Sequence, residues 1–214
     1  MPTILDRREY RRIETEALET RTAEDGAMIV EGYATTYNQP YTLFREKDMI
    51  VREQVDPCAF DGTDMTDVIM QYDHEGRVFA RVKNGTLELE SDEHGLKIRA
   101  NLGGTEIGRQ LFEEIKGGYT NKMSFGFTVA DQKRTRSKDA EGNIVVLRTI
   151  TRIGKLFDVS AVSLPANDAT EISARSIGDG LIAEAVKEIQ AEEERARKIG
   201  EIRKILKGEE NHDE

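Results

Sequence analysis

Alternation of apolar and polar residues predicts a β-hairpin near the middle of the chain. Residues 86–90 place two leucines on one face, and residues 96–101 alternate Leu, Ile and Ala with polar residues. The intervening residues 91–95 form a turn-like cluster that ends in glycine. An earlier strand is expected at residues 28–37, which are rich in Ile, Val, Tyr and Thr.

An amphipathic helix is predicted directly after this hairpin. Ile107, Leu111 and Ile115 recur every four residues, which places them on one helical face. Thr105 can cap the start of the helix, and Gly117 is a typical stop signal.

Three further strand candidates follow this helix, at residues 123–129, 144–153 and 156–164. In the first of them, apolar residues alternate with small ones that include Ser124, so the two sets lie on opposite faces. Many strands with few helices between them favour the α+β class. We expect a small, closed or partly open β-barrel with surrounding helices.

Both ends of the chain are expected to be helical extensions of a central domain at residues 26–176. Residues 1–25 are highly charged and have no firm apolar face. Residues 177–214 predict an amphipathic helical tail with an acidic end. Such a tail can dock on its own domain or bind a partner, and the sequence favours neither.

The composition indicates a charge-rich globular protein. With 37% hydrophobic and 34% charged residues and a net charge of −10, it lacks the basic character of most nucleic-acid binders. Its basic cluster, residues 133–138, is expected to be a solvated hairpin loop, so nucleic acid is not an expected partner. No apolar run approaches the length of a membrane span, and the charged first ten residues do not resemble a signal peptide. The single Cys58 excludes an internal disulfide and is compatible with a reducing cytoplasm.

His74 is the best-placed candidate for a general base among the three histidines. It follows the apolar residues 68–70 at the end of a strand-like run, whereas His94 lies in a predicted turn and His212 in the acidic tail. An imidazole titrates near neutral pH and therefore suits proton transfer. A structural or incidental role for His74 remains an alternative on the sequence alone.

Ser124 and Asp158 can supply the other two groups that a serine hydrolase needs, a nucleophile and a group that orients the base. Ser124 shares its strand face with Gly126 and Thr128, which are small enough for a substrate backbone to approach. No nucleophile elbow surrounds it, and an ordinary outward-facing serine is the alternative. Asp158 lies within an apolar strand, where a carboxylate is costly unless it is paired. An exposed edge position is the alternative for Asp158.

Metal and thiol chemistry have weaker support. Asp73, His74 and Glu75 are consecutive, so they cannot all face one ion, and no second metal-binding motif is present. No metal or other cofactor is therefore expected. Cys58 lies beside a proline turn, which is typical of a free structural thiol.

Six segments carry a further pattern when they are taken in order. They are residues 29–34 (IVEGYA), 53–60 (EQVDPCAF), 72–74 (YDH), 87–100 (a hairpin of the form L-x-L-x-x-D-x-x-G-L), 123–127 (MSFGF) and 156–167 (LFDVSAVSLPAN). Together, these segments resemble the motifs of the caudovirus prohead protease family. Cys58 stands where relatives usually have glycine, and Asp158 where they often have glutamate.

This resemblance implies a serine endopeptidase with Ser124 as nucleophile, His74 as base and Asp158 as third member of the triad. It implies a fold related to the herpesvirus assemblins, with a small β-barrel ringed by helices. The expected location is the host cytoplasm, inside the assembling procapsid. The expected substrates are scaffold, the scaffolding extension of the major capsid protein, and the protease itself.

Two details of this mechanism are our own expectations. The backbone amides of Ala166 and Asn167 are predicted to form the oxyanion hole, since a chain that leaves a strand at a proline can expose successive N–H groups. Self-association is expected, with the helical tail as a candidate contact. The competing hypotheses are a non-enzymatic capsid assembly factor and a metal-assisted hydrolase built around His74.

Overall fold

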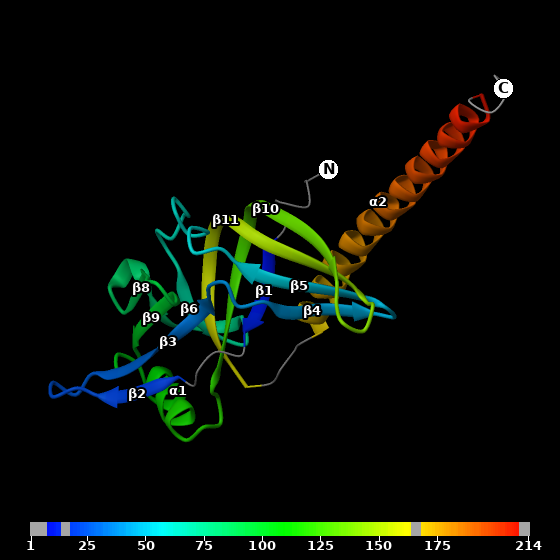
Figure 1. Cartoon of the computed structure of the whole chain (residues 1–214). Helices are drawn as coiled ribbons and strands as arrows, with labels where there is room; N and C mark the ends of the chain where they lie inside the picture. The colour runs from blue at the N-terminus through cyan, green and yellow to red at the C-terminus, as the bar shows by residue number, and fades with distance from the viewer. Residues whose placement is uncertain (1–7, 14–17, 164–167, 210–214) are drawn as a thin grey trace.

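The computed structural model (Figure 1) describes residues 8–13, 18–163 and 168–209, with side chains at residues 8–11, 18–163 and 177–202. One sheet has seven strands, which are β1 (Arg8–Ile13), β10 (Lys122–Lys138), β11 (Ile144–Val162), β5 (Met49–Val55), β4 (Tyr41–Glu46), β6 (Ile69–Tyr72) and β7 (Glu75–Arg81). The other has four, which are β2 (Glu19–Thr22), β3 (Met28–Thr36), β9 (Gly95–Asn101) and β8 (Leu87–Ser91). The helical elements are α1 (Glu106–Lys116), α2 (Asp168–Glu209) and the 3-10 turn η2 (Val82–Asn84).

The long antiparallel hairpin of β10 and β11 organises the larger sheet. The first part of β11 pairs in parallel with β5, and its last part pairs in parallel with β6. On its other side, β10 pairs antiparallel with β1. Irregularities in the ladder between residues 126 and 132 increase the local twist, so the sheet curls as half a barrel.

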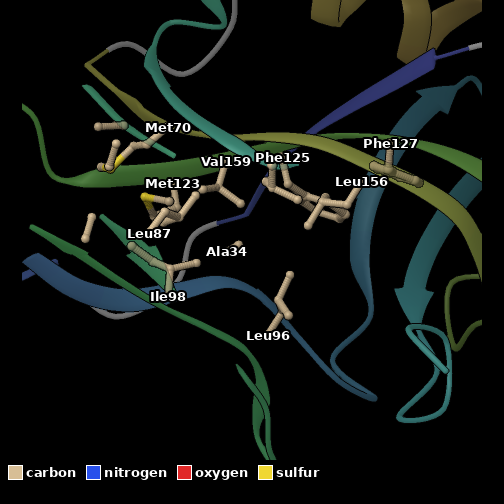
Figure 2. Close-up of a cluster of buried hydrophobic side chains, with 14 of the residues drawn as sticks. Ala34, Met70, Leu87, Leu96, Ile98, Met123, Phe125, Phe127, Leu156 and Val159 are labelled. Atoms are coloured by element: carbon tan, nitrogen blue, oxygen red, sulfur yellow. The ribbon is translucent and has the colours of Figure 1, made fainter. Parts of the chain in front are cut away.

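The hydrophobic core lies between the two curled sheets (Figure 2). Met123, Phe125 and Phe127 extend from one face of β10 and are fully buried. They pack in one cluster with residues of the smaller sheet such as Leu96 and Ile98. The predicted alternation along residues 123–129 is therefore confirmed, and it leaves Ser124 on the opposite face of β10.

The predicted sheet-rich α+β class is confirmed, and so are the hairpin at residues 86–101 and the helix after it. The helix begins where predicted, because the backbone N–H of Gly108 donates to Thr105 Oγ1 at 3.0 Å. The expectation of surrounding helices holds only in part, since the described residues form just two α-helices. None of the helices described here is long and apolar enough to cross a membrane.

The prediction of a helical N-terminal extension is wrong, because residues 8–13 and 19–22 form β1 and β2. The inward-facing residues of β1 are Glu9 and Arg11, which are buried by ion pairing rather than by apolar packing. Hydrophobic patterning therefore gives no strand signal there. The domain limits at residues 26 and 176 remain a prediction.

The basic cluster at residues 133–138 is also not the solvated hairpin loop that was predicted, since it lies within β10. Arg136 donates to Glu192 at 2.5 Å, and Arg134 pairs with Glu184. Both glutamates belong to α2, so exposed basic residues of the strand face an acidic side of the helix.

The helical tail is confirmed as α2, and its near end docks on the domain. Leu181 and Ala185 are buried against Met49, Val51 and Val146 of the larger sheet. Beyond this contact and the ion pair of Glu192 with Arg136, the helix projects away from both sheets (Figure 1).

Candidate active site

Ser124 lies in β10 between β1 on one side and β11 on the other. In the β10–β11 ladder, Ser124 faces Ser160 and Gly126 faces Asp158. Residues two apart on a strand share a face, so these four residues form one polar patch opposite the apolar core. Ser124 has only 2% of its surface exposed, and Asp158 and Ser160 are fully buried.

His74 reaches this patch from the turn that joins β6 to β7. Tyr72 pairs with Glu75, which leaves Asp73 and His74 as a two-residue hairpin turn. Both turn residues have positive φ, 48° and 62°, as the turns favoured in two-residue hairpins require. The Asp73 N–H donates to the carbonyl of Ala161 at 3.0 Å, which fixes the turn beside the end of β11.

Hydrogen bonds join the three predicted residues into one chain. Asp158 Oδ1 lies 2.5 Å from His74 Nδ1, and Ser124 Oγ lies 2.5 Å from His74 Nε2. A proton on Nδ1, donated to the carboxylate, leaves Nε2 free to accept the serine hydroxyl proton. The arrangement is therefore able to move a proton from Ser124 to His74, with Asp158 orienting the ring.

The surroundings of Asp158 favour its ionised form. Burial raises the pKa of this carboxyl group, but hydrogen bonds from His74 and Ser160, together with the positive charges beside it, outweigh burial and lower it. The Ser160 hydroxyl donates to Oδ1 at 2.8 Å, and the Arg8 guanidinium pairs with Oδ2. Asp158 is thus an anion held in place from several sides, which suits it to stabilise an imidazolium.

Gly126 provides the space in which the Asp158 carboxylate lies. A Cβ atom at residue 126 would come within 2.3 Å of Asp158 Oδ2 and 3.0 Å of Tyr10 Cε1. The space expected for a substrate backbone is therefore filled in this structure by Asp158 and by a residue of β1.

The structure thus brings together His74, Ser124 and Asp158, and adds three residues that the sequence did not indicate. Ser160 shared a strand face with Asp158, and that spacing was its available signal. Arg8 and the Tyr10 ring, which packs edge-on against His74 at 4.5 Å, come from β1, which was predicted to be helical.

The other candidates lie elsewhere. His94 packs against Tyr33 with ring centroids 4.6 Å apart, and Cys58 is a free, exposed thiol. Ala166 and Asn167, predicted for the oxyanion hole, and His212 fall outside the described residues. Across the described part of the chain, no group of three or more His, Cys, Asp and Glu side chains is arranged to hold a metal ion.

Comparison with known proteins identifies a family. Residues 16–181 match the family model of the caudovirus prohead serine protease. Among solved structures, the chain is similar to the capsid assembly protease gp21 of bacteriophage T4, with 13% sequence identity and a TM-score of 0.41. That match covers 73% of this chain and 99% of the phage T4 chain. No curated protein matches the sequence.

Proposed function

The chain belongs to the caudovirus prohead serine protease family, and we propose that Ser124, His74 and Asp158 are the catalytic triad of this protease. The observation that carries the proposal is the continuous hydrogen-bond chain from Asp158 through His74 to Ser124. These residues come from three different strands or turns, so their convergence is a property of the fold and not of one local motif.

In the proposed reaction, Ser124 Oγ attacks a peptide carbonyl carbon while His74 Nε2 accepts the hydroxyl proton. The imidazolium then donates that proton to the leaving amine as the C–N bond breaks. Water, activated by the same imidazole, hydrolyses the acyl-enzyme and restores Ser124. Asp158 keeps the Nδ1 proton directed at its carboxylate throughout. The amides of Ala166 and Asn167 remain our proposal for the groups that bind the oxyanion.

We propose that the substrates are proteins of the immature capsid: scaffold, or a scaffolding extension of the major capsid protein, and the protease itself. Assembly of the protease inside a procapsid would bring it to high local concentration with these chains. Self-association is part of the proposal, and the projecting half of α2 supports it, because Ile199 and Ile202 are 51% and 55% exposed there. Specific activity is then expected to rise with enzyme concentration, and a flat response would remove self-association from the proposal.

The test of the function is intact-mass spectrometry of the protein after prolonged incubation, alone and with capsid precursor. Discrete, time-dependent cleavage is expected for the natural chain and for Ser137→Ala, an exposed serine on the same strand. Cleavage is expected to be absent in Ser124→Ala. The fold of that variant is expected to survive, since removing one strand hydroxyl costs about 1 kcal/mol or less.

Other outcomes point to the competing hypotheses. If no sample is cleaved even with capsid precursor present, the non-enzymatic assembly factor becomes the better explanation. Cleavage that chelators stop and Ser124→Ala does not would instead favour metal-assisted hydrolysis near His74.

A further inference from the structure

β1 lies against the strand that carries Ser124, as an added antiparallel strand would. Arg12 pairs with Ser124 and Tyr10 with Gly126 in the β1–β10 ladder. Ser124 Oγ lies 2.9 Å from the carbonyl oxygen of Arg11 and donates to it. Extended peptides often bind proteins by adding a strand to a sheet edge in this manner. The peptide group between Arg11 and Arg12 therefore lies beside the proposed nucleophile.

This contact competes with the proposed catalytic hydrogen bond. Ser124 has one hydroxyl proton, and both His74 Nε2 and Arg11 O are within hydrogen-bond distance of its oxygen. While the proton is donated to Arg11 O, it is not shared with the base. With Ser124 at 2% exposure, a second peptide cannot reach Oγ until β1 moves.

Glu9 and Arg11 lie on the face of β1 that is opposite Ser124. There they contact the buried, charged side chains of Glu53 and Arg148, which together we call the receptor. Arg11 Nε donates to Glu53 Oε1 at 2.5 Å, and its terminal NH2 group donates to Glu53 Oε2 at 3.1 Å. Arg148 in turn donates to the two carboxylate oxygens of Glu9, at 2.8 and 3.0 Å. None of these four side chains is more than 2% exposed.

Such paired contacts between a guanidinium and a carboxylate are selective for charge. A planar guanidinium matches a carboxylate through two parallel hydrogen bonds, and a buried charge without its partner is strongly unfavourable. A strand with another charge pattern at these two positions would leave Glu53 or Arg148 facing the wrong sign. The receptor therefore discriminates between peptides by excluding mismatched charges as well as by binding matched ones.

The receptor also stays balanced without β1. Arg148 donates directly to Glu53 at 2.5 Å and to Gln132 Oε1 at 2.5 Å, and the Tyr41 hydroxyl donates to Glu53. The departing strand keeps its own Glu9–Arg11 pair. β1 also lies outside the part of the chain that matches the protease family, which begins at residue 16. One strand can thus replace another with no isolated charge left behind.

We propose that β1 occupies the substrate position, and that its sequence Glu9-Tyr10-Arg11 matches the sequence preference of the active site. The inference rests on the proposed function. The preferred substrate is an extended peptide with arginine directly before the cleaved bond and an acidic residue two positions earlier. Glu53 and Arg148 are the specificity-determining residues, and β1 acts as a competitor in the full chain. Cleavage transfers the acyl group ending in that arginine to Ser124 Oγ, releases the amine, and consumes one water.

The first test offers peptides to the natural full-length protein. One peptide has the sequence of residues 6–17; the others carry Arg11→Glu or Glu9→Lys. Mass spectrometry is expected to show cleavage after the arginine at position 11, with kcat/KM at least about tenfold higher than for either charge-reversed peptide. Equal rates for the three peptides would overturn the inference. Capsid precursor serves as the reference substrate, and Ser124→Ala as the blank.

The second test weakens the competitor in the full chain. In the double variant Glu9→Gln/Arg11→Gln, β1 loses both ionic contacts. KM for the natural peptide is expected to fall several-fold with kcat unchanged, as for relief of competitive inhibition. The control is Glu19→Gln/Arg21→Gln, an exposed pair with the same spacing in β2. A double variant that only melts earlier, with no fall in KM, would mark β1 as structural.

The two tests separate the inference from the function. If capsid precursor is cut in a Ser124-dependent way while the peptide is cut by neither the natural chain nor the double variant, the inference fails and the function stands. If nothing is cut in a Ser124-dependent way, the proposed function fails, and the inference that rests on it fails as well.

Discussion

Asp158 faces Gly126 across the β10–β11 ladder, and its carboxylate lies where a side chain at residue 126 would be. The buried carboxylate and the absent side chain are therefore one feature of the site. The position of the proposed orienting group depends on a residue that itself has no functional atoms.

Gly126→Ala is expected to reduce kcat by about 10²-fold, because even a displacement of about 1 Å at a catalytic group has this effect. The added methyl group must push Asp158 Oδ2 or the Tyr10 ring aside. Peptidase assays on the folded variant would measure the loss. Gly104→Ala is the matched control, since a Cβ there meets no atom within 4 Å. Full activity in Gly126→Ala would show that Asp158 tolerates another position.

Asp158→Asn is expected to lower kcat by about 10⁴-fold, as when the orienting carboxylate of a serine protease triad becomes an amide. The amide has the same shape but favours the wrong imidazole tautomer. Asp158→Glu is expected to retain more activity than Asp158→Asn, because it keeps the charge. Kinetics with capsid precursor would rank the variants, with the exposed Asp131→Asn as control. Equal activity in the natural chain and Asp158→Asn would remove Asp158 from the triad.

The buried Glu53 is expected to make stability depend on pH. Burial raises the pKa of Glu53, but the charges of Arg11 and Arg148 outweigh burial and lower it from 4.5 to about 2. A carboxyl group with a lowered pKa in the folded state stabilises the fold above its unfolded pKa. This contribution is expected to be complete above pH 4.5 and to disappear as the pH falls towards 2.

Urea unfolding between pH 7 and pH 2 would measure this effect. Glu53→Gln is expected to lose about 3–5 kcal/mol at neutral pH, because it leaves buried arginines with too few counter-charges. Its stability is also expected to fall less steeply across the acidic range than that of the natural chain. The exposed Glu90→Gln is the control for loss of one carboxylate. Parallel pH profiles for Glu53→Gln and the natural chain would contradict the assignment.

Asp73→Val is expected to destabilise the fold by about 1–3 kcal/mol, since a β-branched residue is strained at positive φ. Asp73 has a φ of 48°, and its turn carries His74. Activity is expected to fall as well, because the imidazole loses its fixed position. Asp73→Gly, which tolerates this backbone, is expected to remain close to the natural chain in melting temperature and kcat. Similar losses in both variants would show that the Asp73 side chain matters more than its backbone.

The sequence predicted those parts of the fold in which burial is apolar. The alternation around Phe125 and Phe127 and the spacing of Leu111 and Ile115 correspond to strand β10 and helix α1. The same alternation put Ser124 on the polar face. These elements follow from hydrophobic periodicity because each buries one apolar face.

β1 could not be predicted in this way, because what it buries is charge. Glu9 and Arg11 are as buried as core residues, and the Glu53 and Arg148 side chains that pair with them lie far away in the sequence. The sequence placed His74 at the end of a strand-like run, but it did not predict the hairpin turn that carries this residue. Its turn uses Asp-His at two positive φ angles instead of a glycine, so no local turn signal marked it.

The two-residue turn at Asp73 and His74 also limits how this region can change during evolution. An insertion or deletion of one residue between Tyr72 and Glu75 would slip the β6–β7 register and exchange the faces of every following side chain. Chain length beside the imidazole is thus constrained together with the identity of His74. Homologous chains that keep this hairpin are therefore expected to keep its two-residue length, and to gain or lose residues in connections farther from the site.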